Sequence, residues 1–240
     1  METKLLHGDC YEIIPTLPDN SISLVVTDPP FNFQNHGGGS LYKKGTQRME
    51  TLNKLKDLDC WEFSPRKFLD LLFPKMESFY GYFFCNKLLV DEYIAWAKEH
   101  KFKFDVLAMI KLNAVPAFNG HHLNDIEYII LIRKGGTYFN TKSQFDDYRK
   151  WYEVTCRKRI HPAEKPVELL ERFVRVSCPE NGVIFDPFMG SGSTGVAAIQ
   201  NNRNFIGIEK DDAYFDLASK RLKERQNELN GVGSLFEGML

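Results

Sequence analysis

The chain has 240 residues, of which 43% are hydrophobic and 26% charged, and its formal net charge is −1. This length allows one α/β domain with a sizeable core, and the composition is that of an ordinary globular protein. No apolar run approaches the roughly 18 residues that a membrane-spanning helix needs. Because the N-terminus also lacks the apolar core of a signal peptide, we expect a cytoplasmic protein that does not contact membranes.

The cysteines and the basic residues narrow the functional classes. The five cysteines lie far apart with no Cys-x-x-Cys pair, which favours reduced thiols over disulfides or a zinc site. A net charge near zero argues against a nucleic-acid-binding protein. Two segments are nevertheless basic: residues 42–56 and residues 149–159 each contain five lysines or arginines and one glutamate. Each segment alone is typical of a solvated loop.

Strands and helices alternate along most of the chain. In chain order, the apolar patterns and breaker residues predict a strand at 5–9, a helix at 11–17, a strand at 22–27, a helix at 65–76, a strand at 80–85, a helix at 88–100, strands at 105–111 and 126–133, a helix at 167–177, a strand at 183–185, a helix ending at 200, a strand at 204–209 and a helix at 213–229. This alternation is typical of an α/β fold with a mostly parallel sheet and helices on both faces. We expect a single domain over 1–240, with a long loop at 32–62, an irregular segment at 134–160 and a poorly ordered tail from 231.

A glycine-rich turn follows the predicted strand 183–185. Its sequence is Asp186-Pro187-Phe188-Met189-Gly190-Ser191-Gly192-Ser193-Thr194, and its glycines would let the backbone approach a ligand closely. About twenty residues further on, Glu209 ends the next strand, where a carboxylate can accept both ribose hydroxyls of an adenosine group. Helix–strand packing could explain the turn alone, but its pairing with Glu209 favours a nucleoside ligand.

A dinucleotide is the main alternative ligand. Gly190, Gly192 and Gly195 have the spacing of Gly-x-Gly-x-x-Gly. However, Asp186 at the strand tip would repel a pyrophosphate, whereas its charge suits the cationic amino acid part of S-adenosylmethionine. We therefore expect S-adenosylmethionine as the ligand.

A second polar motif, Asp28-Pro29-Pro30-Phe31, follows the apolar strand 22–27. The two prolines fix the backbone and supply no N–H, so the carbonyls before them are ready acceptors. The Asp28 carboxylate beside the Pro29 carbonyl is an acceptor pair suited to an NH₂ group, and Phe31 offers a face for stacking. Alone, the motif could be a rigid turn that only ends a strand. Together with a site for S-adenosylmethionine, it indicates methylation of an amine.

These motifs resemble those of the DNA amino-methyltransferases of bacteria and phages, including the enzymes of restriction–modification systems. The amine-binding motif comes first and the cofactor motif last, which resembles the circularly permuted β group, with its Rossmann-like methyltransferase fold. The resemblance implies Asp28, Pro29, Pro30 and Phe31 as catalytic residues, although the family usually has Tyr at the position of Phe31. Stacking survives this departure, but a hydrogen bond through the hydroxyl is lost.

The resemblance also implies which residues hold S-adenosylmethionine. Asp9 would contact its adenine, Glu209 its ribose, and the segment His161-Pro162-Ala163-Glu164-Lys165-Pro166 its methionine part. The complete implied set is Asp9, Cys10, Glu164, Lys165, Asp186, Phe188, Gly190, Ser191, Gly192, Thr194 and Glu209.

Double-stranded DNA is the implied substrate, with the target base extruded from the helix and stacked on Phe31. Residues 32–62 would form a mobile loop over that base, and residues 134–160 a target-recognition insert. The expected phosphate contacts are Lys43, Lys44, Arg48, Arg149, Lys150, Arg157, Lys158 and Arg159. The resemblance also allows a homodimer and a cognate restriction endonuclease as partners.

Several alternatives stay open beside adenine N6. Cytosine-N4 enzymes are the nearest, although they more often carry Ser at the position of Asp28. Methylation of RNA or of a protein glutamine is less favoured, because the motifs for those substrates usually begin with Asn and follow the cofactor motif. Methylation of cytosine C5 is disfavoured, because that chemistry needs Pro-Cys where this chain has Cys178-Pro179. A catalytically inactive DNA-binding protein is the alternative from another class. His121-His122 lacks further ligands at zinc spacing, so we interpret it as a pair of loop histidines and expect no metal.

Overall fold

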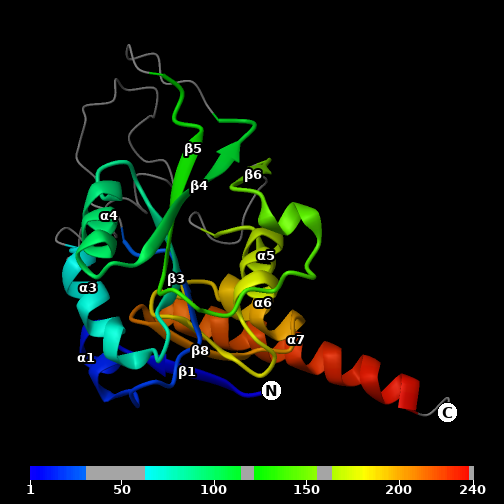
Figure 1. Ribbon diagram of the computed structural model, residues 1–240. Coiled ribbons are helices and arrows are strands. Elements are labelled where there is room, and N and C mark those ends of the chain that lie inside the picture. Colours follow the sequence, from blue (N-terminus) through cyan, green and yellow to red (C-terminus); the bar gives the residue numbers. More distant parts are fainter. Residues whose placement is uncertain (31–62, 115–121, 156–163, 238–240) are drawn as a thin grey trace, which may run out of the picture.

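The computed structural model describes residues 1–30, 63–114, 122–155 and 164–237. These residues form an eight-stranded sheet with helices packed against it (Figure 1). No helix within these four ranges is both long and apolar enough to cross a membrane.

The sheet is mostly parallel. From one edge to the other, its strands are β1 (Thr3–His7), β8 (Asn204–Glu209), β7 (Val183–Asp186), β2 (Leu24–Thr27), β3 (Tyr80–Cys85), β5 (Ile126–Arg133), β4 (Lys103–Lys111) and β6 (Trp151–Val154). Strand β5 runs against its neighbours β3 and β4, and the other described pairs are parallel. The central strands β2 and β3 are buried along their whole length, as continuous apolar runs in a covered parallel sheet should be.

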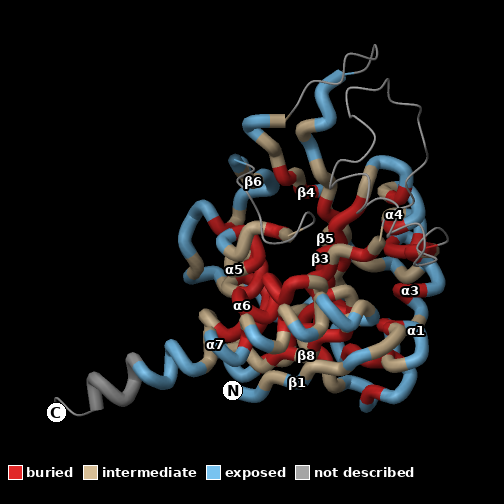
Figure 2. The backbone as a smooth tube through the Cα atoms, turned by 180° about the vertical axis from the view of Figure 1, so that it is seen from behind, coloured by how far each residue is buried: buried red, intermediate tan, exposed pale blue. Residues whose placement is uncertain are grey.

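Helices cover both faces of the sheet. Figure 1 shows α1 (Cys10–Ile13), α3 (Pro65–Leu72) and α4 (Val90–Glu99) on one face, and α5 (Val167–Ser177), α6 (Ser193–Gln200) and α7 (Asp212–Glu237) on the other. In α5, the buried residues Leu169, Leu170, Phe173 and Val174 recur at the spacing of one helix face. Figure 2 shows the buried residues concentrated between the two helix layers.

The predicted α/β fold is confirmed, but two local predictions were wrong. Residues Trp151–Val154 form the edge strand β6 where an irregular segment was expected, because this short strand is only half-buried and gives little apolar signal. Helix α7 continues to Glu237, although its end was expected at about residue 229. Glycine costs about 1 kcal/mol inside a helix, but no proline interrupts this segment, so the helix continues.

Two helices also end earlier than predicted. Helix α1 gives way to a 3₁₀ turn at Ile14–Thr16, and α3 to one at Phe73–Lys75. Each turn contains a proline, which removes an N–H from the helical ladder.

The carboxyl ends of the parallel strands β1, β8, β7 and β2 meet at one edge of the sheet. In open α/β sheets, ligands bind outside this edge. The fold therefore brings the strand ends at Asp28, Asp186 and Glu209 to the same edge of the sheet.

Candidate active site

The strand tips that carry the two motifs are neighbours. Asp28 follows β2 and Asp186 ends β7, and these strands pair in parallel with Leu24 opposite Ile184. Across the pair, Thr27 Oγ1 donates a hydrogen bond to Asp186 Oδ1 at 2.7 Å, and both residues are buried. The Asp28 tip and the glycine turn therefore lie side by side.

The turn after β7 leaves room for a ligand at Gly190. Its φ of +50° is left-handed, and no described atom beyond its chain neighbours lies within 4 Å of the place a Cβ would take. The Gly190 N–H donates to Glu209 Oε2 at 2.9 Å, which joins the turn to the tip of β8. Gly195 differs, because a Cβ there would lie 2.8 Å from atoms of both Leu222 and Phe205. The last glycine of the dinucleotide-like spacing therefore serves helix packing.

Asp186 is held by donors from the protein itself. Its Oδ1 accepts from the Thr27 hydroxyl and from the Phe188 N–H at 3.1 Å, and the Thr194 side chain gives a further hydrogen bond. Burial raises the pKa of the Asp186 carboxyl to about 6, and the hydrogen bonds offset part of this rise. This carboxyl therefore fixes the shape of the glycine turn.

The acids of β8 and β1 lie along the same edge. Burial raises the pKa of Glu209. Hydrogen bonds from the N–H groups of Gly190, Lys210 and Asp211 to its carboxylate offset part of this rise. Asp9 caps α1 and pairs with Lys210 Nζ at 3.0 Å. Cys10 is buried, and burial raises the pKa of its thiol to about 12, so the thiol stays protonated.

Arg221 of α7 links the segment before α5 to the glycine turn. Its Nη2 pairs with Glu164 Oε1 at 2.7 Å, and its Nη1 donates to the Ser191 carbonyl at 3.1 Å. Gly192 follows in the turn as the N-cap of α6. Glu164 and Ser191 thus lie together as the resemblance implied. Arg221 was not predicted as a site residue, since one more basic residue in a charged helix gives no signal in the sequence.

Lys165 was expected beside the cofactor, and the structure places its ammonium on Asp28. Lys165 Nζ forms an ion pair with Asp28 Oδ2 and lies 3.3 Å from Glu127 Oε2 and 5.0 Å from the centre of the Phe84 ring. Lys111 pairs with Glu127 Oε1. Glu127 and Lys111 were also not predicted, and the available signal was a charged residue near the start of the apolar strand β5 and another at the end of β4.

Burial and charge oppose each other in this cluster. Burial raises the pKa of Asp28, and the charge of Lys165 offsets part of the rise. Burial alone would lower the pKa of Lys165, but Asp28 and Glu127 outweigh it and the pKa is raised. Burial alone would raise the pKa of Glu127, but Lys165 and Lys111 lower it overall. Asp28 Oδ1 is buried and has no hydrogen-bond partner among the described residues.

The remaining predicted site residues are only partly described. Phe188 packs against Phe63 and Phe68, with ring centroids 5.9 Å and 5.4 Å away. Pro29 is buried and Pro30 half-buried. The expected loop 32–62 and these predicted residues lie outside the described ranges: Phe31, Lys43, Lys44, Arg48, Arg157, Lys158, Arg159 and His121.

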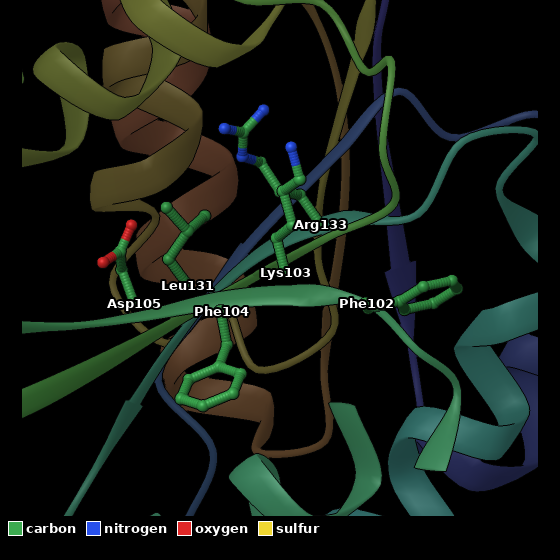
Figure 3. Close-up of a pocket in the computed structure, with 6 residues that line it drawn as sticks. All are labelled: Phe102, Lys103, Phe104, Asp105, Leu131 and Arg133. Atoms are coloured by element: carbon green, nitrogen blue, oxygen red, sulfur yellow. The ribbon is translucent and has the colours of Figure 1, made fainter. Parts of the chain in front are cut away.

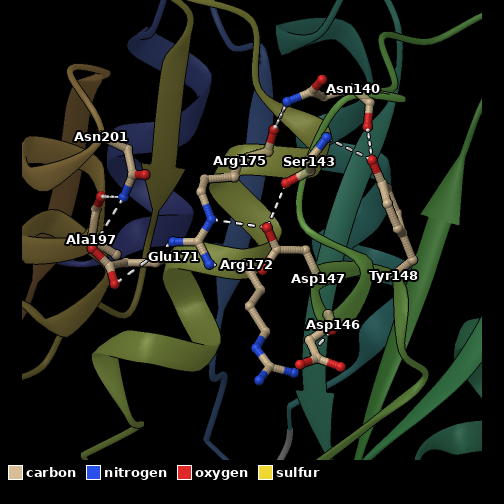
Figure 4. Close-up of polar contacts among 10 residues, drawn as sticks. All are labelled: Asn140, Ser143, Asp146, Asp147, Tyr148, Glu171, Arg172, Arg175, Ala197 and Asn201. Atoms are coloured by element: carbon tan, nitrogen blue, oxygen red, sulfur yellow. Dashed lines mark hydrogen bonds and ion pairs between the residues drawn. The ribbon is translucent and has the colours of Figure 1, made fainter.

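The segment after β5 is anchored to α5. The buried Asp147 accepts hydrogen bonds from Arg175, at 2.7 Å from Nη2 and 3.0 Å from Nε (Figure 4). Ser143 donates to the same carboxylate, and the Tyr148 hydroxyl donates to the Asn140 carbonyl at 2.6 Å. The described part of the expected recognition insert is therefore docked on the core.

Arg149 and Lys150 lie on the exposed side of this segment, beside β6. Arg149 Nε pairs with Asp146 at 2.6 Å, and its guanidinium lies 5.4 Å from the Phe145 ring and 5.1 Å from the Trp151 ring. Lys150 pairs with an aspartate of β4. The side chain of Phe145 is 76% exposed and that of Trp151 43%. Exposed aromatic rings can stack on bases, and the cation between them can contact a phosphate.

A hollow of about 320 Å³ lies at the far end of β4 and β5 from Lys111 and Glu127. It is lined by Phe102, Lys103, Phe104, Asp105, Leu131 and Arg133. In Figure 3, Asp105, Leu131 and Arg133 point to one side of β4 and Phe104 to the other. The hollow is separate from the strand tips. In the described ranges, no group of three or more His, Cys, Asp or Glu side chains could hold a metal ion.

Comparisons with known proteins point to one family. A family model described as DNA methylase matches residues 22–220. The chain is 30% identical to the putative methylase YubD of Escherichia coli (strain K12), over 95% of this chain and 93% of that protein. It is 28% identical to the Type II methyltransferase M.HinfI of Haemophilus influenzae, over 95% of this chain and 70% of that protein.

Solved structures share the fold. The crystal structure of the M1.HpyAVI–SAM complex has a TM-score of 0.68 and 24% identity, covering 92% of this chain and 100% of that chain. The PvuII DNA methyltransferase (cytosine-N4-specific) has a TM-score of 0.69 and 17% identity, covering 95% and 92%.

Proposed function

Because this chain belongs to the DNA methylase family, we propose that it methylates N6 of adenine in double-stranded DNA. Family membership confirms the resemblance to DNA methyltransferases acting on adenine N6 or cytosine N4, for which S-adenosylmethionine is the cofactor. The observation that carries the proposal is the position of Asp28 beside the glycine turn. Adenine is preferred because cytosine-N4 enzymes more often carry Ser in place of Asp28.

The edge formed by Gly190, Glu209 and Asp9 fits the cofactor. Gly190 leaves space for close approach of a ligand, Glu209 places a carboxylate where ribose hydroxyls can donate to it, and Asp9 lies at the tip of the neighbouring strand. When bound, S-adenosylmethionine supplies an electrophilic methyl group on a sulfonium cation. The acidic side chains along this edge favour that positive charge.

Asp28 is proposed to bind the amine of the target base. An exocyclic amine conjugated to its ring is a poor nucleophile. Hydrogen bonds from the NH₂ group to Asp28 Oδ1 and to the Pro29 carbonyl would favour a more tetrahedral nitrogen and stabilise the positive charge that develops on it. The buried Oδ1, which has no partner among the described residues, suits this role.

The amine of a paired base is inaccessible inside the duplex, so the base must be extruded at a cost of a few kcal/mol. Phe31 is proposed to offset part of this cost by stacking, and residues 32–62 to close over the base. Arg149 and Lys150, with the exposed rings of Phe145 and Trp151, are proposed to contact the DNA. Because both cations already have acidic partners, binding DNA would exchange those partners for phosphates.

The proposal extends to location and partners. We propose that the enzyme acts in the cytoplasm on double-stranded DNA, as a homodimer or together with a cognate restriction endonuclease. The other basic residues expected at phosphates keep that role here as a proposal: Lys43, Lys44, Arg48, Arg157, Lys158 and Arg159.

The decisive experiment is single-molecule sequencing of DNA from methylation-deficient cells that express the chain. Detection of N6-methyladenine in a defined sequence context would support the proposal. Detection of N4-methylcytosine would instead show that cytosine N4 is the target. Asp28→Ala should lower the methylation rate by about 10²–10³-fold, by analogy with other preorganised hydrogen-bonding groups. Asp91→Ala, on the exposed side of α4, is the matched control and should leave the rate unchanged.

Calorimetry separates the enzyme from an inactive DNA-binding protein. Wild type and Asp28→Ala should both bind S-adenosylmethionine, since the Asp28 carboxylate is assigned to the base. A wild-type protein that binds DNA but does not bind S-adenosylmethionine would contradict the proposed function.

A further inference from the structure

A row of alternating charges leads away from the proposed amine site. Asp28 Oδ2 pairs with Lys165, whose Nζ lies 3.3 Å from Glu127 Oε2, and Glu127 Oε1 pairs with Lys111. Along this charge row (Asp28, Lys165, Glu127 and Lys111), the side chains are 18%, 8%, 21% and 22% exposed. Four separate parts of the fold supply them: the tip of β2, the segment before α5, β5 and β4.

We propose that the charge row positions Asp28 for methyl transfer. Lys165 binds Oδ2 and favours the ionised form of the carboxylate, which leaves Oδ1 as the oxygen presented to the amino group of the base. Lys165 is thus a positioning residue for the reaction, and Glu127 and Lys111 fix its place and its charge. This inference rests on the proposed function, because it concerns the same amine-binding acid.

The need for Lys165 follows from burial. A buried carboxylate without a counter-ion takes up a proton, because desolvation disfavours its charged form. A protonated Asp28 could present a hydroxyl donor where the amine needs an acceptor, and it would stabilise less of the charge developing on nitrogen. The ammonium of Lys165 opposes this protonation because its charge lowers the pKa of Asp28, and its contact with the Phe84 ring at 5.0 Å helps to hold it in place.

Glu127 meets a second requirement. The amine gains positive charge as the methyl group is transferred, and an uncompensated ammonium nearby would oppose that change. Glu127, 3.3 Å from Lys165 Nζ, compensates this ammonium. Lys111 in turn balances Glu127, so the row sums to zero charge when all four groups are ionised.

Other titratable groups also act on Asp28, from three further elements. They are Asp186 of β7, Cys85 of β3 and Tyr93 of α4. Burial raises the pKa of Cys85 to about 12 and that of Tyr93 well above its ordinary value, so both stay neutral at working pH. Asp186 does titrate, but it is the same in every variant compared below.

The test is the pH dependence of the single-turnover methylation rate on duplex DNA, with S-adenosylmethionine saturating. The acid limb is the part of the pH profile in which the rate falls as Asp28 takes up a proton. Removing the cation in Lys165→Met should move this limb to higher pH by about 1–3 units. At a fixed pH on the acid side, the rate should then be at least about tenfold lower than that of the wild type. Lys111→Met should move the limb in the same direction by less. Glu127→Gln should move it to lower pH, because the Glu127 charge acts to raise the pKa of Asp28.

Two controls separate positioning from folding. Lys165→Arg keeps the charge and should keep the wild-type limb. Glu99→Gln neutralises a glutamate that also has an ion pair, with Arg66 at 2.6 Å on the exposed surface, and should leave the profile unchanged. If Lys165→Met fails to fold, Lys111→Met and Glu127→Gln still decide, since both side chains are partly exposed.

Opposite displacements of the acid limb in Lys111→Met and Glu127→Gln would support the proposal. A purely structural role would lower the rate at every pH and leave the limb in place, and that outcome overturns the inference while the proposed function stands. A wild-type protein that methylates no DNA overturns the proposed function and the inference with it.

Discussion

Replacing Asp186 with Asn tests how the core holds the glycine turn. Asp186 is 4% exposed, and burial raises its carboxyl pKa from 3.8 to about 6. Asn keeps an Oδ1 that can accept from Thr27 and from the Phe188 N–H, so the substitution removes the charge and retains these two hydrogen bonds. It changes the hydrogen bond with the Thr194 side chain, but that cost is the same at every pH, so the pH dependence is compared. The comparison therefore isolates the cost of ionising a buried carboxyl.

The expected magnitude follows from proton linkage. A group whose folded-state pKa is raised stabilises the fold fully below its unfolded pKa, and this contribution is lost as the pH rises through the folded pKa. For Asp186 the window is pH 3.8 to about 6. Since one pH unit corresponds to about 1.4 kcal/mol, the wild type should lose about 2 kcal/mol of unfolding free energy through this group between about pH 4.5 and pH 7.

The assay is urea denaturation of the wild type and Asp186→Asn at both pH values, without cofactor. The stability difference between the two proteins should change by about 2 kcal/mol in favour of Asn at the higher pH. Asp216→Asn, at an exposed position of α7, controls for a general charge effect. Parallel pH curves for the wild type and Asp186→Asn would refute the argument, because the buried carboxyl would then not be titrating in the folded state.

Two further predictions concern the cofactor turn and the DNA surface. Arg221→Met removes the partner of Glu164 and the donor to Ser191, so it should lower the unfolding free energy by about 1–3 kcal/mol. By loosening the turn it should also weaken S-adenosylmethionine binding at least about tenfold, measured by calorimetry. Arg149→Ala should weaken DNA binding about equally across sequences and reduce the salt slope by about 1, measured by fluorescence anisotropy at several salt concentrations. Arg225→Ala, which removes the ion pair with Glu228 on α7, is the control. It should change neither the affinity for S-adenosylmethionine nor the affinity for DNA.

The elements that hold the site could be predicted because their patterns are local. Strands β3, β5 and β8 and helix α5 have the predicted bounds, since each is a strongly patterned run between breakers. Strand β6 was not predicted, because it is stabilised by pairing with β4, which lies more than forty residues earlier in the sequence. The end of α7 was predicted too early, because the glycines after Asn230 weaken a helix without ending it.

The site divides in the same way. Asp28, Gly190 and Glu209 stand in motifs whose chemistry is readable in sequence, and the parallel pairing of β2, β7 and β8 brings them to one edge. Lys111 and Glu127 stand in no motif. They reach Lys165 because β4 and β5 pair in antiparallel register, with Met109 opposite Glu127. Such a contact depends on strand order, which periodicity does not reveal.

The adjacent residues Glu164 and Lys165 connect the two halves of the site. Glu164 pairs with Arg221 at the glycine turn, and Lys165 pairs with Asp28. Both pairs depend on the short non-helical segment that leads into α5, so a displacement of that segment would disturb the cofactor side and the amine side together. Motif similarity assigns both residues to the cofactor. In the structure, Glu164 lies at the cofactor motif and Lys165 at the amine-binding motif. Alignment of the sulfonium methyl group with the target amine should therefore depend on a segment outside both motifs.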